Sequence, residues 1–193
     1  MRTITYLACI MLAINCNNHQ PEQKIALKDS TPAADSTKEP VISIEETTMK
    51  SMHLLVIKDT AQSTALIGPK LGADYGKIGK CMKACNAQMA GAPMASYNQQ
   101  QAPFIFEAAV PFNIICPNPT GGVYNKEIKA GKAVVAHFFG PYELTVKGHA
   151  AIQAWLKKNH KTATGSSWEV YVTDPTTVKD PYLVQTDIYY TIQ

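Results

Sequence analysis

The sequence predicts an α+β fold built from two similar strand-helix-strand-strand units. Their strands would form one antiparallel sheet, with two helices on one side and a central groove between the units. Three observations support this prediction: several short apolar runs alternate with period two, two longer stretches carry apolar residues at helical spacing, and the order of these elements repeats. At 193 residues, the chain is long enough to bury one such core.

The first unit begins with an apolar run at residues 54–57 that predicts a strand, followed by a turn at 67–71 and a helix. One face of this helix is marked by apolar side chains at steps of three and four, which are Leu71, Tyr75, Ile78, Met82, Cys85 and Met89. Gly91 and Pro93 close the helix. Two further strands are expected, at 94–97 and 104–112.

The second unit repeats this order. A strand at 133–139 leads through a turn at 139–144 into a second helix. The apolar face of that helix carries Leu144, Gly148, Ala151, Ile152, Trp155 and Leu156. Strands at 168–173 and 183–192 complete the unit, the last one with an alternating, mostly apolar face.

The spacing between the units is nearly constant. Gly68-Pro69 aligns with Gly140-Pro141 at an offset of 72 residues, and Tyr97 aligns with Tyr171 at an offset of 74. This spacing indicates an internal duplication.

Residues 1–16 resemble a lipoprotein-type signal peptide. A short basic start precedes an apolar run that is too short for the roughly 20 residues needed to span a bilayer. The run stops at Cys16, the position that becomes lipidated in bacterial lipoproteins. Ala13 and Asn15 depart from the usual lipobox, so an ordinary cleaved signal with an incidental cysteine is the alternative. We expect an exported protein of the bacterial cell envelope, held on the membrane by lipid at Cys16.

Residues 17–48 are expected to be a flexible linker. Proline, serine, threonine and alanine alternate there with charged residues, and few large apolar side chains are present to offset the entropy of ordering. The domain is therefore expected to occupy residues 49–193.

The charge pattern argues against a nucleic-acid partner. The formal net charge is only +3, and Arg2 is the single arginine, whereas nucleic-acid readers usually gather arginine and lysine on one face. No cofactor is predicted either, because the sequence has no glycine-rich phosphate loop and no Ser–His–Asp order.

No metal site is predicted. Cys81 and Cys85 lie one helical turn apart, and two thiols are too few for zinc, so core packing is the expected role. Cys116 could pair with either of them, which would leave an odd thiol. His137 is expected to be a core histidine, and the remaining histidines, including His149, show no metal spacing.

Several motifs resemble the GyrI-like, or AraC-type effector-binding, domain of bacteria. In the second unit they are Gly140-Pro141-Tyr142, Ala154-Trp155-Leu156, Trp168-Glu169-Val170-Tyr171 and Asp174-Pro175; in the first unit they are Pro93, Tyr97 and the run from Phe106 to Pro111. The resemblance covers residues 49–193. It implies the duplicated fold and a central groove that binds apolar, often cationic small molecules, with a glutamate among aromatic rings.

By position, that glutamate is Glu169. The equivalent residue of the first unit is Ala95, so the carboxylate belongs to one half only. A carboxylate beside aromatic rings attracts cations by charge and through cation–π contacts. The alternative is a glutamate on the solvent face of an amphipathic strand. The candidate ligand-binding residues are Glu169, Tyr171, Tyr142, Tyr97, Trp168 and Phe106.

Three functions are compatible with this site. The first is a binding module for an apolar or cationic small molecule. The second, also found among relatives, is hydrolysis of strained electrophilic molecules, with Glu169 as general base and Tyr171 or Tyr142 assisting. The third is inhibition of a protein partner such as gyrase, which the expected export argues against because gyrase is cytoplasmic.

Overall fold

The computed structural model describes residues 38–98 and 101–193, so the expected signal peptide, Cys16 and linker residues 17–37 lie outside the described residues. The strands and α-helices, in chain order, are β1 (Val41–Met49), β2 (Met52–Ala61), α1 (Ile67–Ala84), β3 (Met94–Tyr97), β4 (Phe104–Pro111), β5 (Tyr124–Ile128), β6 (Gly131–Phe139), α2 (Thr145–Lys158), β7 (Trp168–Tyr171) and β8 (Gln185–Thr191). Among these elements, no helix is both long and apolar enough to cross a membrane.

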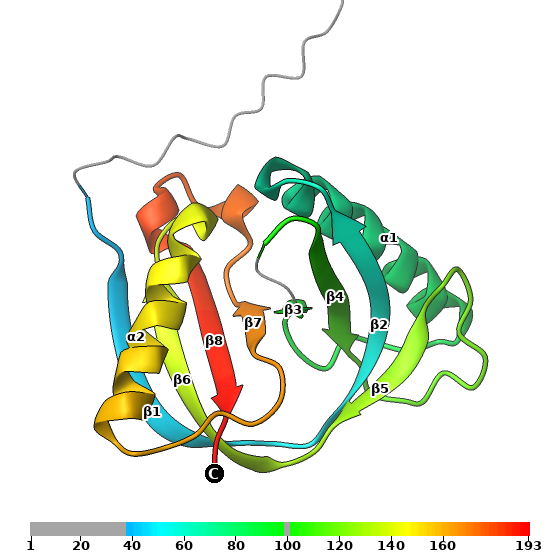
Figure 1. The fold of residues 1–193 in the computed structure, drawn as a ribbon. Helices are drawn as coiled ribbons and strands as arrows, with labels where there is room; N and C mark the ends of the chain where they lie inside the picture. Colours follow the sequence, from blue (N-terminus) through cyan, green and yellow to red (C-terminus); the bar gives the residue numbers. More distant parts are fainter. Residues whose placement is uncertain (1–37, 99–100) are drawn as a thin grey trace, which may run out of the picture. The chain divides into compact units, whose positions relative to one another are not determined.

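The eight strands form one sheet in the order β1-β6-β8-β7-β3-β4-β2-β5, and every neighbouring pair is antiparallel (Figure 1). The predicted α+β class is confirmed. The units β2-α1-β3-β4 and β6-α2-β7-β8 repeat the same order, and they join through β3 and β7 at the centre of the sheet.

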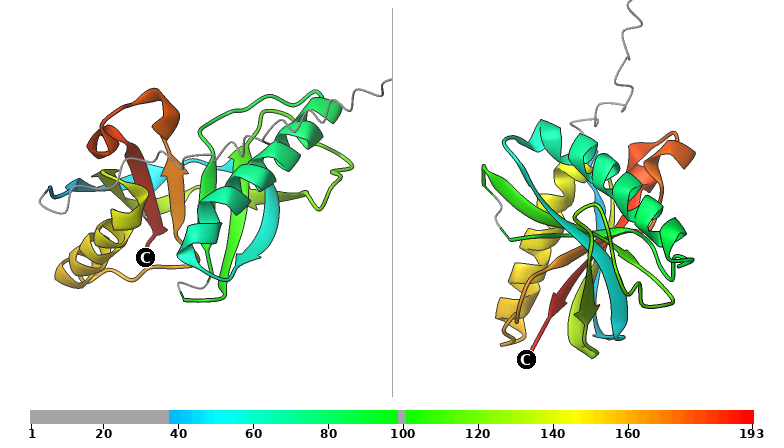
Figure 2. Two further views of the ribbon diagram at one scale, coloured as in Figure 1. Left: turned by 90° about the horizontal axis from the view of Figure 1, so that it is seen from above. Right: turned by 90° about the vertical axis from the view of Figure 1, so that its right-hand side faces the viewer.

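The register shows that both helices cover the same face of the sheet. Glu169 lies directly opposite Ala95 on one side and Ile188 on the other, so these three side chains share a face. Ala95 belongs to the apolar cluster packed under α1, and Ile188 to the cluster packed under α2. Figure 2 shows one helix over each half of the sheet.

The strand β1 corrects the expected linker. Val41–Met49 pairs with β6 along its whole length, and Ile42 and Ile44 pack against the cluster under α2. The range 17–48 is therefore wrong for residues 41–48. Sequence patterning missed the strand because Ser, Glu and Thr occupy most of its other positions, as suits an edge strand with one wet face.

The two halves exchange their edge strands. Only two residues separate β1 from β2, yet β1 pairs in the second half and β2 in the first. In the same way β5 precedes β6 but pairs with β2. Each half therefore depends on a strand from the other half's stretch of chain.

The helices differ from expectation at their ends. The expected turn at 67–71 is the first turn of α1, and the helix ends at Ala84, so Met89 is exposed rather than part of its apolar face. In α2, Gly148 permits close packing on the sheet, because a Cβ there would lie 2.6 Å from Cδ1 of Ile188.

Candidate functional site

Glu169 is a nearly buried carboxylate at the middle of β7, with 7% of its surface exposed. Its Oε1 lies 2.9 Å from Nε2 of His149 on α2, and its Oε2 accepts a hydrogen bond of 3.1 Å from the hydroxyl of Tyr171. In the described part of the chain, no lysine or arginine forms an ion pair with it. The carboxylate is thus held by hydrogen bonds without a permanent cation to neutralise it.

His149 was not expected at the site. Its Nε2–H donates to the Glu169 carboxylate, while its Nδ1 lies 2.9 Å from the hydroxyl of Tyr190 on β8. The ring is therefore fixed from both sides. One sequence signal was available: His149 lies three residues before Ile152, which places it near the sheet-facing side of the helix.

A chain of phenols continues from the carboxylate across the boundary between the two halves. The hydroxyls of Tyr171 and Tyr97 lie 3.1 Å apart. Because Tyr171 donates its proton to Glu169, Tyr97 must donate to Tyr171. We call Glu169, His149, Tyr190, Tyr171 and Tyr97 the Glu169 cluster. The two tyrosines that the repeat aligned at an offset of 74 thus meet in this cluster.

The pKa values of four tyrosines are raised by the low polarity and the negative charge of this region. Burial raises the pKa of Tyr75, Tyr97 and Tyr171 well above the ordinary value, and the charge of Glu169 raises each further. Burial, with smaller contributions from Asp174 and Glu169, raises the pKa of Tyr142 to about 12. The phenols therefore stay neutral at physiological pH.

Tyr75, on α1, and Tyr142, just before α2, add two more aromatic rings near Glu169. The Tyr75 hydroxyl, on α1, donates to the Met94 carbonyl at 3.0 Å. Tyr142, just before α2, is 36% exposed and meets Tyr171 edge to face at a centroid distance of 5.4 Å. Rings from both units thus surround one carboxylate.

Phe106 and Thr186 lie on the same face of the sheet. Phe106 is fully buried beside Tyr97, with ring centroids 6.2 Å apart. Thr186 lies directly opposite Tyr171, and its buried hydroxyl has no hydrogen-bond partner among the described residues. A bound molecule or a water would satisfy such a group.

Trp168 is not part of this arrangement. It precedes Glu169 on the same strand and so points to the opposite face, where it packs in a separate apolar cluster with Met94 and Val170. Trp168, one of the candidate ligand-binding residues, therefore lies on the other face of the sheet from Glu169.

The opposite face carries the other buried glutamate of the described residues, Glu107, which is 8% exposed. It accepts a hydrogen bond of 2.8 Å from the Tyr124 hydroxyl and forms an ion pair with Lys126, whose ammonium lies over the Trp168 ring. Unlike Glu169, this carboxylate already has its cation.

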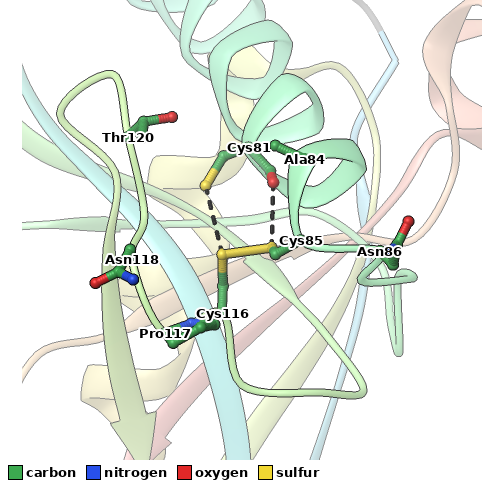
Figure 3. Close-up of a pocket in the computed structure, with 8 residues that line it drawn as sticks. All are labelled: Cys81, Ala84, Cys85, Asn86, Cys116, Pro117, Asn118 and Thr120. Carbon is green, nitrogen blue, oxygen red and sulfur yellow. Dashed lines mark hydrogen bonds between the residues drawn. A yellow bond between two sulfur atoms is a disulfide. The ribbon is translucent and has the colours of Figure 1, made fainter.

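The cysteines depart from simple core packing. Cys85 and Cys116 form a disulfide, one of the pairings that the sequence left open, and buried Cys81 is free. These three residues line a pocket at the end of α1 (Figure 3).

His137 is half-buried rather than enclosed in the core, with Nδ1 2.8 Å from Asp187.

Residues 94–193 match the GyrI-like small molecule binding domain, which is more than half of the chain. No curated protein matches the chain.

Solved structures share the fold at low sequence identity. The C-terminal domain of EcmrR superposes with a TM-score of 0.67 at 17% identity, covering 79% of this chain and 98% of that domain. In the EcmrR–DNA complex the same match spans only 57% of the EcmrR chain, at 16% identity and a TM-score of 0.67, with 79% of this chain covered.

Two further structures are more distant. A hydrolase from Listeria innocua has a TM-score of 0.56 at 12% identity, covering 78% of this chain and 91% of the hydrolase. SAV2435, solved with bound tetraphenylphosphonium, has a TM-score of 0.51 at 8% identity, covering 78% of this chain and 94% of SAV2435.

Proposed function

The chain belongs to the GyrI-like family of small molecule binding domains, and from this premise we propose that its Glu169 cluster binds an apolar, cationic molecule between the two pseudo-repeats. The observation that carries the proposal is the Glu169 carboxylate, which is 7% exposed, has no lysine or arginine partner among the described residues, and is surrounded by neutral phenols. Two of its lone-pair positions are used by His149 and Tyr171, which leaves acceptor capacity for a ligand.

Charge should outweigh ring contacts in this site. A cation 4 Å from the carboxylate gains about 4 kcal/mol at the effective dielectric of a partly shielded region. A cation–π contact adds about 0.5–2 kcal/mol for a ring such as that of Tyr171 or Tyr97. The rings therefore select apolar, aromatic ligands, while Glu169 selects their charge.

One structural relative supports this ligand class. SAV2435 was solved with tetraphenylphosphonium, a cation whose charge is enclosed by four phenyl rings. Such a molecule would present rings to the tyrosines and a positive centre to Glu169. It is therefore a suitable first probe for this chain.

The test is a calorimetric titration with tetraphenylphosphonium and with a neutral aryl compound, triphenylphosphine oxide. Loss of a shielded charge pair costs about 2–5 kcal/mol, so Glu169→Gln should weaken binding of the cation about 30-fold or more and change binding of the neutral compound little. The matched control is Glu107→Gln, which removes an equally buried carboxylate from the opposite face. Equal loss in both variants, or no loss in Glu169→Gln, would refute the assignment.

A second candidate function is hydrolysis. The carboxylate has a histidine and a phenol within hydrogen-bond distance, an arrangement that can hold and deprotonate a water. The Listeria innocua hydrolase shares the fold. Mass spectrometry of strained electrophiles incubated with the protein decides between the functions: turnover that Glu169→Gln abolishes, with ligand binding retained, would favour the enzyme.

We also propose that the protein is exported and anchored by lipid at Cys16. The apolar run ending at this cysteine supports the proposal, and so does the Cys85–Cys116 disulfide, because disulfides persist mainly in oxidising compartments. Metabolic labelling with an acyl probe should mark the protein, and Cys16→Ser should abolish the label. An unlabelled mature protein free of membranes would contradict the anchor.

A further inference from the structure

Three cysteine sulfurs lie close together outside the Glu169 cluster. Cys81 lies in the last turn of α1, Cys85 follows the last helical residue, and Cys116 comes from the segment between β4 and β5. All three sulfurs lie within 4.8 Å of one another (Figure 3). Neither ligand binding nor hydrolysis at Glu169 uses them.

The three sulfurs form a triangle rather than a line. Attack of Cys81 on the disulfide requires its sulfur to lie on the axis of the S–S bond. The Cys81 and Cys116 sulfurs are 4.0 Å apart, so an attack along that axis would put Cys81 and Cys85 about 6 Å apart given a bond of about 2.05 Å. The upper limit of 4.8 Å rules out this alignment.

A triangle of this size fits a single metal ion. Three sulfurs at about 2.3 Å from one ion lie about 4 Å from each other in a trigonal arrangement. The observed 4.0 Å between the Cys81 and Cys116 sulfurs matches this spacing. Only the disulfide holds the Cys85 sulfur closer.

We propose that Cys81, Cys85 and Cys116 form a redox-gated site for Cu(I). A dithiol reductant transfers two electrons and two protons to the disulfide; the S–S bond breaks, two thiols form, and the dithiol becomes its own disulfide. Cu(I) then binds the three sulfurs and displaces thiol protons to solvent. Soft thiolates select Cu(I) or zinc, but structural zinc needs four ligands, and among the described residues this group offers three.

The site keeps its shape without the disulfide because other bonds hold the loop. The side-chain amide of Asn125 donates to the Cys116 carbonyl at 2.8 Å. The backbone of Gln88, after α1, donates to the side chain of Asn113 at 2.9 Å, and the Asn113 backbone donates back at 3.2 Å. Reduction therefore frees the sulfurs while their backbones stay in place.

Solvent can reach the cluster. The three cysteines line a pocket. Its other lining residues include Asn86, Asn118 and Thr120, and these three residues are exposed. An ion can enter through this pocket, while buried Cys81 anchors the inner side of the site in the core under α1.

The experiment uses the full chain, reduced with a dithiol and then freed of it without oxygen, in competition for Cu(I) with the coloured chelator bicinchoninate. We expect one Cu(I) per reduced chain, none per oxidised chain, and binding more than about 100-fold weaker in Cys81→Ser, beyond the loss typical of outer contacts. X-ray absorption should show a shell of three sulfurs. The matched control, Cys9→Ser with Cys16→Ser, should bind as the parent does.

Circular dichroism of the reduced protein accompanies each titration, because the proposal requires a folded site. Equal affinity in Cys81→Ser would overturn it, since two sulfurs would then suffice. Two other results would overturn it as well: loss of Cu(I) binding in the control variant, and Cu(I) binding only when the reduced protein is unfolded.

Discussion

Removal of β1 tests whether this strand belongs to the domain. A variant that begins at Lys50 lacks Val41–Met49, whereas a variant that begins at Lys38 keeps it. Met49 is only 5% exposed, and Ile42 and Ile44 pack against the cluster under α2. The exposed edge of β6 would then offer its unpaired backbone groups to other chains.

The magnitude follows from these three side chains. Full burial contributes about 1.5–3 kcal/mol per large apolar side chain, and two of the three are only partly buried, so the loss is about 4 kcal/mol. For a domain of this size, 1 kcal/mol corresponds to about 2–4 °C in Tm. We therefore expect the shorter variant to melt about 8–16 °C below the longer one.

The assay is urea and thermal unfolding followed by circular dichroism, with light scattering to detect association through β6. The variant beginning at Lys38 should unfold like the full chain. If the variant beginning at Lys50 melted within a few degrees of it, the packing assigned to β1 would be refuted.

Three further predictions concern single side chains. Cys85→Ser opens a disulfide that spans 31 residues, and we expect about 3–4 kcal/mol less stability to urea; an unchanged midpoint would contradict this. Burial lowers the pKa of His137, but the hydrogen bonds and charges of Asp187 and Glu45 together outweigh it and raise the pKa above its ordinary 6.5. The resulting stability is complete below pH 6.5 and lost as pH rises through the raised value, so His137→Gln should flatten a pH series of urea midpoints. Tyr171→Phe removes a donor to the buried Glu169 carboxylate and should cost about 1–3 kcal/mol of stability; wild-type midpoints would show that this bond contributes nothing.

Local patterns in the sequence predicted most of the fold. Periodicity located both helices and six of the eight strands, because these elements bury one face and so alternate strongly. The offset of 74 residues that aligns Tyr97 with Tyr171 also aligns Ala95 with Glu169, and the structure pairs the latter two directly. The strands β1 and β5 escaped because edge strands have polar residues on their exposed face.

The site was less predictable because its contacts are tertiary. The bond from His149 to Glu169 depends on how α2 is placed on the sheet, and no local pattern specifies that placement. Strand alternation alone requires Trp168 to point away from its neighbour Glu169, and the structure follows the alternation. The choice of Cys85 rather than Cys81 as the partner of Cys116 also depends on the loop conformation.

The most direct test of the central claim is an experimental structure of the protein with tetraphenylphosphonium bound. We expect the phosphonium centre on the helix-covered face beside the Glu169 carboxylate, with the Tyr97 or Tyr171 ring centroid within about 6 Å, the usual limit of a cation–π contact. A ligand found at the cysteine pocket or on the Trp168 face, with the Glu169 cluster unchanged, would contradict the account.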